Sequence, residues 1–397
     1  MKKVSICKEN ITYTRDNIMK ICFFSHGSGT NQDGATLSML NVMEELASRG
    51  HFVIGVMAKD VNLDYMKAKK NIKFYFLPSY DMRLDLSRNS LDIELKYFIK
   101  NKLNWFVMRK TLRVLRNENL DIIHINGLNN GIGALIAKKL KIPYVWHIRQ
   151  LMQEDLNQRL YNQKQVWALV KAATDVIAIS KAVRDKFEKK FGRKIKVVYN
   201  GVPLANYQVK KHEIFVSNCF RIILAGRIVY GKGQLDAVKA VEVIVNNGNK
   251  AIRLILVGHS QDQYADQVKR YVLESNLSDY VEFQDHNSDL RALRATCDIG
   301  LTCSKKEAFG RVTVENQMAG LLTIGSDTGG TLELIDHEKT GLLYREGDYE
   351  NLANLIDYAL KNKEKMRLLA YNGYQNAINM FSIVRVVDQV LDIYESL

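Results

Sequence analysis

Two acidic side chains flank the start of an expected helix in the second half of the chain. Glu307 precedes Phe309-Gly310-Arg311, and Glu315 lies inside the helix that begins there. A helix that begins after a glycine presents unpaired N–H groups and the positive end of its dipole, and both attract anions. Carboxylates on either side can accept hydrogen bonds from hydroxyl groups. The segment therefore predicts a phosphate site beside hydroxyl-bearing groups, although an acidic residue near a helix start can also simply stabilise the dipole.

A second group of residues that could bind a ligand is a pair of cations at the end of an expected strand. Gly226-Arg227 and Lys232-Gly233 follow the apolar run 221–225 directly. Open α/β sheets bind their ligands in loops at the carboxyl ends of strands, and two cations suit a diphosphate. Taken alone, the same residues would also fit a solvated loop.

The first half of the chain offers a polar loop and two histidines. The loop 26–34 lies between a strand and a helix but lacks the G-x-G-x-x-G spacing of a dinucleotide fingerprint. His124 and His147 both end expected strands. Each can serve in the core or face a ligand, and the position of His147 favours a role at the site.

The elements that must position these residues alternate between short β-rich runs and helical patterns, which is typical of parallel sheets. Strands are expected at 20–25, 52–57, 73–77, 121–125, 143–147, 175–179 and 195–199, and then at 221–225, 252–257, 280–283, 298–302 and 322–325. Helices are expected at 35–49, 95–117, 131–140 and 181–190, and then at 232–247, 261–275, 288–295, 311–319 and 349–361. The pattern predicts two doubly wound, Rossmann-like α/β domains that face each other across a cleft.

The domain limits follow from where these patterns begin and stop. Residues 1–18 are expected to form an N-terminal extension, 19–203 a first domain and 204–380 a second domain. Residues 381–397 are expected to form an amphipathic helix capped by Ser382.

Composition narrows the class of protein. The 5 cysteines are scattered without a C-x-x-C pair, which indicates free thiols in a reducing compartment. No run reaches the ~20 apolar residues of a membrane span, and the start has no apolar signal core, so a cytoplasmic protein is expected.

The net charge of +14 arises from the first half of the chain, where Lys and Arg number 35 against 18 acids; the second half has 22 against 25. The first half is therefore expected to face something acidic.

The ordered motifs resemble those of glycosyltransferase family 4, retaining enzymes of the GT-B fold, over residues 19–397. They are Asp33-Gly34-Ala35, Ser180, Asn200-Gly201-Val202, Gly226-Arg227 with Lys232-Gly233, Glu307 with Glu315, Asp327-x-Gly329-Gly330, and Thr340-Gly341-Leu342. Asp33 departs from the glycine that the family usually has there, which leaves the details of that loop open.

The resemblance implies a role for each matching residue. Arg227 and Lys232 would clamp a diphosphate, with help from backbone N–H groups of the segment Phe309-Gly310-Arg311. Glu315 would hold the ribose hydroxyls and Glu307 the hydroxyls of the transferred sugar. Gly34 would line the donor site, His147 would lie near the reacting sugar, and the loop 284–287, with His286, would border the base. The C-terminal helix is expected to cross back to the first domain.

These expectations combine into a metal-independent transferase without a cofactor. It would move a hexose or N-acetylhexosamine from a nucleotide-diphosphate sugar, with UDP as the default, to a glycan or polyprenyl-diphosphate-linked acceptor in surface polysaccharide synthesis. No D-x-D motif offers a metal site. The alternatives are a sugar-nucleotide epimerase or hydrolase of the same fold and a basic nucleic-acid-binding protein, for which no motif is found.

Residues 95–116 predict a membrane contact. They carry seven Lys and Arg and no acid, interleaved with Phe98, Trp105 and Phe106. A basic amphipathic helix of this kind can lie on the anionic inner face of the cytoplasmic membrane, or pack its apolar stripe on the sheet with its lysines in solvent.

Overall fold

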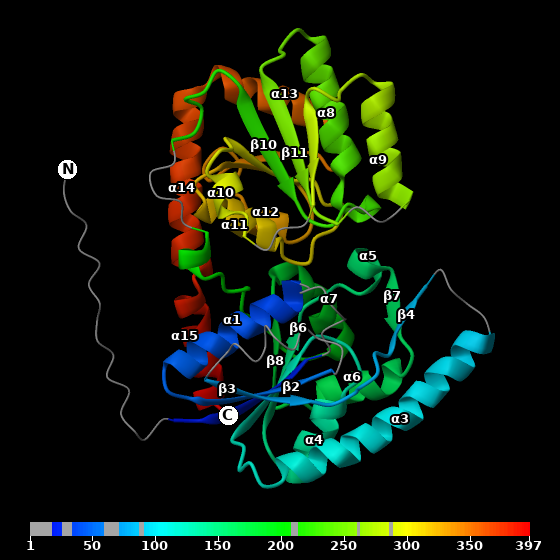
Figure 1. Ribbon diagram of the computed structural model, residues 1–397. Helices are drawn as coiled ribbons and strands as arrows, with labels where there is room; N and C mark the ends of the chain where they lie inside the picture. Colours follow the sequence, from blue (N-terminus) through cyan, green and yellow to red (C-terminus); the bar gives the residue numbers. More distant parts are fainter. Residues whose placement is uncertain are drawn as a thin grey trace, which may run out of the picture.

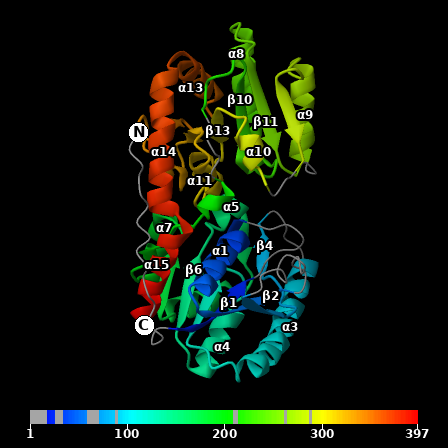
Figure 2. The same ribbon diagram turned by 60° about the vertical axis from the view of Figure 1, so that its left-hand side comes forward.

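The computed structural model describes residues 18–25, 34–58, 71–86, 91–207, 213–259, 263–285 and 289–397. The expected extension, apart from Ile18, the loop 26–33 and His286 lie outside the described residues. The molecule consists of two α/β domains stacked end to end, with helices α14 and α15 running along one side of both (Figures 1 and 2).

The first domain is built on a parallel sheet in the order β3-β2-β1-β5-β6-β8-β9. Its strands are β1 (Lys20–Ser25), β2 (Phe52–Met57), β3 (Ile72–Phe76), β5 (Ile122–Asn126), β6 (Tyr144–Ile148), β8 (Asp175–Ala178) and β9 (Lys196–Val197). Its helices are α1 (Gly34–Ser48), α3 (Leu91–Leu115), α4 (Ile132–Leu140), α5 (Gln153–Leu156), α6 (Gln163–Lys171) and α7 (Lys181–Phe191). The strands are buried on both faces: Cys22 and Phe24 pack with α3, α4, α6 and α7, while Ile21 and Phe23 pack with α1 and α15.

The second domain repeats this plan with the strand order β12-β11-β10-β13-β14-β15. Its strands are β10 (Phe220–Ala225), β11 (Ile252–Val257), β12 (Val281–Gln284), β13 (Ile299–Thr302), β14 (Leu322–Ser326) and β15 (Leu342–Tyr344). Its helices are α8 (Gln234–Asn246), α9 (Gln263–Glu274), α10 (Arg291–Arg294), α11 (Arg311–Met318), α12 (Thr331–Leu334), α13 (Tyr349–Lys361) and α14 (Lys363–Phe381). Each sheet reverses its winding direction once, between β1 and β5 and between β10 and β13. Such switch points are where doubly wound sheets place their ligands.

Two chain crossings connect the domains, and they lie side by side. The first follows Val202, and the second joins α14 to α15 (Ile383–Glu395), which packs against α1 of the first domain. Val202 pairs with Ser382: the Val202 N–H donates to the Phe381 carbonyl at 2.9 Å, and the Ile383 N–H donates to the Val202 carbonyl at 3.2 Å.

The expected cap by the Ser382 side chain is wrong. The Ser382 backbone is extended and its hydroxyl makes no capping hydrogen bond to α15. The bridge to Val202 holds the start of the helix instead, because it supplies a partner for the Ile383 N–H.

A short antiparallel pair, β4 (Arg83–Asp85) with β7 (Gln158–Leu160), stands beside the first sheet. The helix α3 runs along the outer side of this domain, away from the second domain (Figure 1). None of the helices in the described part of the chain combines the length and hydrophobicity that a membrane span requires.

Candidate functional site

An ion pair occupies the switch point of the second domain. Lys232 lies in the loop after β10, and Glu307 lies in the loop after β13, the neighbouring strand. The Lys232 Nζ atom is 2.6 Å from the Glu307 Oε2 atom. The topology therefore joins the predicted diphosphate-binding cation and the predicted sugar-binding carboxylate, which are far apart in the sequence.

Glycines allow these loops to approach so closely. Gly233 has φ +66°, and a Cβ atom there would lie 2.1 Å from the Cys303 carbonyl oxygen. A Cβ atom at Gly329, where φ is +52°, would lie 2.3 Å from the Glu307 carbonyl oxygen. The Gly330 N–H donates to that same oxygen at 2.7 Å. The Asp327-x-Gly329-Gly330 motif thus holds the Glu307 loop by close backbone contact.

The charge of Glu307 is set by two opposing effects. Burial would raise the pKa of its carboxyl, but the Lys232 ammonium and a hydrogen bond with Ser304 hold that pKa below its ordinary value. Arg227 is exposed in the same loop as Lys232, and within the described ranges its guanidinium takes part in no ion pair. The loop therefore presents one paired and one solvent-facing cation.

The start of α11 completes this cluster. Gly310, with φ +95°, precedes the helix, and a Cβ atom there would lie 3.4 Å from the Glu307 side chain, so α11 begins beside the loop that carries Glu307. One turn inside, the Glu315 carboxylate is held by two arginines: Arg311 at 2.7 Å and Arg294 at 2.9 Å. Burial would raise the pKa of Glu315, but the charges of Arg311 and Arg294 keep it below its ordinary value. Glu315 is therefore ionised at neutral pH.

Arg311 also links the two domains. Its Nη1 atom donates to the Ser38 hydroxyl at 3.1 Å, and its Nη2 atom donates to the Tyr207 hydroxyl at 3.1 Å. Ser38 lies on α1 and donates to the carbonyl of Gly34, the first residue of that helix, at 2.7 Å. The structure thus brings the predicted residue Gly34 close to Arg311 from across the interface.

Phe309 contributes to the same interface through its ring. The buried side chain packs against Tyr199 and Phe381, with ring centroids 5.9 Å away in both pairs. Beside it, the Ser180 hydroxyl donates to the Ala308 carbonyl at 2.6 Å. The Phe309 side chain is therefore committed to packing, and only its backbone can serve a ligand.

Glu333 of the second domain caps a helix of the first. Its carboxylate accepts hydrogen bonds from the N–H groups of Lys181 and Ala182 at 2.8 and 2.9 Å, at the start of α7. It also accepts one from the Tyr199 hydroxyl at 3.1 Å. This charge at the positive end of a helix dipole favours the domain arrangement seen here.

His147 is placed differently from the other predicted site residues. Its Nδ1 atom is 3.2 Å from the Nε2 atom of His124, and the His124 Nδ1 atom is 2.7 Å from the Tyr394 hydroxyl of α15. Both rings are buried, and burial together with the Arg149 charge lowers both histidine pKa values well below the ordinary value. His147 is therefore neutral and belongs to a network that reaches the C-terminal helix, while its Nε2 atom is buried without a partner among the described residues. Its predicted place near the reacting sugar stays a prediction. Among the described residues, no hydrogen bond joins it to Lys232, Glu307 or Glu315.

Several residues of the site were missed by sequence reasoning. Arg294, which neutralises Glu315, has the sequence context of an exposed basic residue in a short helix. Ser38, Tyr207 and Glu333 act through contacts between domains. A single sequence carries no signal for these contacts. Within the described ranges, no three His, Cys, Asp or Glu side chains gather as a metal site would require.

Two family models match the chain, one for each domain. The first, "Glycosyltransferase Family 4", matches residues 32–206, and the second, "Glycosyl transferases group 1", matches residues 209–376. The chain belongs to glycosyltransferase family 4. The predicted family and the predicted enzyme class, a glycosyltransferase, are thereby confirmed.

Individual relatives of this glycosyltransferase are distant. N-acetyl-alpha-D-glucosaminyl L-malate synthase of Bacillus anthracis is 26% identical over 72% of this chain and 77% of the relative. An Escherichia coli relative, UDP-Gal:alpha-D-GlcNAc-diphosphoundecaprenol alpha-1,3-galactosyltransferase, is 22% identical over 88% of this chain and 90% of its own length. The structure of Anabaena HepE in complex with UDP and glucose superposes with a TM-score of 0.77 at 22% identity, covering 96% of this chain and all of HepE. The last likeness confirms the predicted GT-B fold, while the ligand contacts of individual residues stay predictions.

Proposed function

We propose that this family 4 glycosyltransferase transfers a hexose or N-acetylhexosamine from a UDP-sugar to a lipid-linked glycan during surface polysaccharide synthesis, with retention of configuration. The observation that supports this proposal most strongly is the Lys232–Glu307 ion pair at the switch point of the second domain, beside the start of α11. The names of relatives support the substrates: the E. coli enzyme uses UDP-Gal and a diphosphoundecaprenol acceptor, and a Staphylococcus aureus relative belongs to capsular polysaccharide biosynthesis.

The site geometry suggests how each group acts on the donor. Lys232, Arg227 and the first N–H groups of α11 stabilise the negative charge that grows on the departing diphosphate. Glu307 accepts hydrogen bonds from hydroxyls of the transferred sugar. Glu315 accepts them from the ribose, since a carboxylate offers about four acceptor positions and Arg311, Arg294 and Tyr207 use three of them.

The reaction needs neither a metal ion nor a side-chain base in this scheme. The acceptor hydroxyl approaches the anomeric carbon on the face that the phosphate leaves. The anomeric C–O bond to the diphosphate breaks, a new C–O bond forms, and a phosphate oxygen takes the acceptor's proton. We assign no proton-transfer step to His147, because its neutral ring lies in the buried network with His124.

A donor assay tests this proposal. We expect the protein to release UDP from a UDP-sugar with an acceptor present, at a rate that EDTA leaves unchanged. NMR of the product should show the anomeric configuration of the donor. An inverted product would contradict retention, and EDTA inhibition that Mg²⁺ or Mn²⁺ reverses would contradict metal independence. Conversion of the donor at the same rate without acceptor would favour the hydrolase or epimerase alternative.

The outer face of α3 supports a membrane location for the acceptor. It exposes large apolar side chains between basic ones, which is unusual for a surface helix. The exposed apolar residues of this face are Leu95, Phe98, Ile99 and Leu103, while the exposed Trp105 and Phe106 border a cavity described below. The exposed basic residues are Lys96, Lys102, Arg109, Lys110 and Arg113. We propose that this face lies on an anionic bilayer.

Flotation with liposomes tests the membrane contact. We expect binding to vesicles that contain phosphatidylglycerol and none to pure phosphatidylcholine vesicles. Replacing Lys96, Lys110 and Arg113 with glutamine should weaken binding roughly a hundredfold, at about 1 kcal/mol for each charge. The same change at the exposed lysines Lys250, Lys339 and Lys361 of the second domain is the control and should leave binding unchanged. Binding that is independent of anionic lipid would refute this contact.

A further inference from the structure

A cavity of about 460 Å³ lies between α3 and the starts of α4 and α6. It is lined by five side-chain amides and a group of apolar side chains. The amides belong to Asn101, Asn104, Asn130, Asn162 and Gln165. The apolar wall includes Trp105, Phe106, Ile132 and Leu135. Its volume falls within the ~300–1,000 Å³ of small-molecule sites.

The lining chemistry suits a neutral sugar. Amides both donate and accept hydrogen bonds, as a ring of hydroxyl groups requires, and an indole packs on the C–H face of a sugar ring. Lys102 is the single charged residue among those that line this cavity, and no acid lines it. One cation is a poor match for a diphosphate, and five amides are a poor match for a hydrocarbon chain.

Part of this wall is fixed in advance. Asn104 both accepts from the Tyr80 N–H at 2.7 Å and donates to the Tyr80 carbonyl at 2.9 Å. Asn130 accepts from the Ile132 N–H at 3.1 Å. By contrast, Asn162 donates to the Gln165 side chain at 3.4 Å, while its own Oδ1 atom is buried without a partner among the described residues. A buried acceptor of this kind lacks a donor that a ligand hydroxyl could supply.

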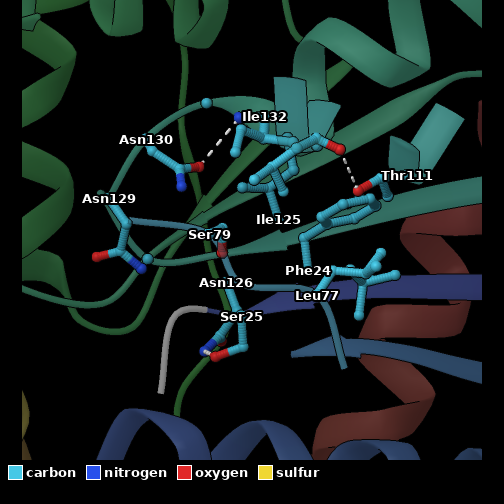
Figure 3. A pocket seen from close by; sticks show the side chains of 15 residues that line it. Phe24, Ser25, Leu77, Ser79, Thr111, Ile125, Asn126, Asn129, Asn130 and Ile132 are labelled. Atoms are coloured by element: carbon cyan, nitrogen blue, oxygen red, sulfur yellow. Dashed lines mark hydrogen bonds between the residues drawn. The ribbon is translucent and has the colours of Figure 1, made fainter. Parts of the chain in front are cut away.

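The cavity adjoins a second pocket on the reaction side of the first domain. Asn130 and Ile132 also line a narrow pocket at the carboxyl ends of β1 and β5, the switch point of this sheet. Figure 3 shows this pocket, with Ser25 and Asn126 together at one end and Asn130 at the other. The α3 cavity and the pocket at the strand ends are therefore neighbours with a shared wall.

We propose that this α3 cavity binds an internal sugar residue of the acceptor glycan, away from the hydroxyl that reacts. This inference rests on the proposed function, because it assumes a saccharide acceptor. It adds that the acceptor is longer than one sugar. The α3 cavity binds the part of the acceptor that lies away from the reacting hydroxyl. The α3 cavity then determines acceptor specificity without touching the donor.

Binding of simple glycosides tests this site without transfer. The probes are methyl α-D-glucopyranoside, methyl α-D-galactopyranoside and methyl N-acetyl-α-D-glucosaminide, followed by saturation-transfer NMR and tryptophan fluorescence. Trp105 is a suitable reporter because it lines the cavity and is half-exposed, whereas Trp146 is fully buried and Trp167 packs against Phe187 and Phe191. We expect saturable binding of at least one probe. It should weaken about tenfold in W105A and in the double variant N162A/Q165A, a loss of about 1.4 kcal/mol.

F52A is the matched control, because Phe52 is an exposed aromatic residue of the first domain that lies outside α3 and is not among the residues that line the cavity. It should bind the probes like the wild type. Failure of every probe to bind, or binding that W105A and N162A/Q165A leave unchanged, would overturn the inference. UDP-sugar turnover is measured in parallel. Turnover without probe binding refutes the α3 cavity alone, whereas probe binding without turnover refutes the proposed transferase reaction and with it the acceptor role, and leaves the α3 cavity only as a sugar-binding site.

Discussion

Replacing Lys232 with alanine is expected to lower kcat by about 10²–10³, the usual effect of removing one group that stabilises charge in the transition state. The Lys232 ammonium lies 2.6 Å from Glu307 at the switch point, where the leaving diphosphate would gain negative charge. The variant also leaves Glu307 without its cation, so the pKa of that carboxyl should rise. The measurement is UDP release at saturating donor.

Two further variants separate catalysis from folding in this test. K232R retains a positive charge and should recover part of the rate, while K239A on α8 removes a lysine outside the predicted site and should be neutral. Urea unfolding should show that K232A is folded. Turnover of K232A near that of the wild type would remove the support for charge stabilisation by this residue.

E315Q is expected to destabilise the protein by about 3 kcal/mol, because it leaves the buried Arg294 guanidinium without its counter-charge. Arg294 has a side-chain exposure of 2% and Glu315 of 11%, so water can compensate little. The surface pair of Glu364 and Arg367 provides the control, since the Glu364 side chain is 87% exposed. E364Q should change stability by less than about 1 kcal/mol. Urea unfolding followed by circular dichroism measures both, and equal effects would show that the Arg294–Glu315 pair is not buried as described.

The same carboxylate predicts how stability depends on pH. The folded pKa of Glu315 lies below the ordinary value of 4.5, so the unfolded chain takes up the proton first. The stabilisation that the Glu315 carboxylate provides is present in full at pH values above its pKa in the unfolded chain. It is lost as the pH falls through its pKa in the folded protein. The stability difference between wild type and E315Q should therefore shrink below about pH 4.5.

The parallel sheets could be predicted because their strands are nearly continuous apolar runs, as strands buried on both faces must be. β11 (Ile252–Val257) begins and ends where its apolar run does. Short elements gave no such signal. β4 and β7 have three residues each and exist because they pair with one another across a long stretch of sequence. The helix α14 was missed since its buried face includes small residues such as Gly373 and Ala377, which weaken the apolar periodicity.

The residues of the candidate site also fall into those that the sequence could predict and those that it could not. Lys232 and Glu307 could be found because glycines and strand ends mark their loops, and the doubly wound topology then forces them together. His147 shows the limit of such reasoning. A strand-end position does not reveal which neighbours a side chain contacts, and the His147 ring contacts His124, which in turn contacts Tyr394. The ion pair of Glu315 with Arg294 could not be predicted from the sequence, because Arg294 becomes a buried partner only when the domain packs.

A crystal structure of the protein with UDP would show directly where the donor binds. We predict that the diphosphate lies between the Lys232 ammonium and the first N–H groups of α11, with the ribose hydroxyls at Glu315. UDP bound at the first switch point, near Ser25 and Asn126, or anywhere else away from Lys232, would contradict it.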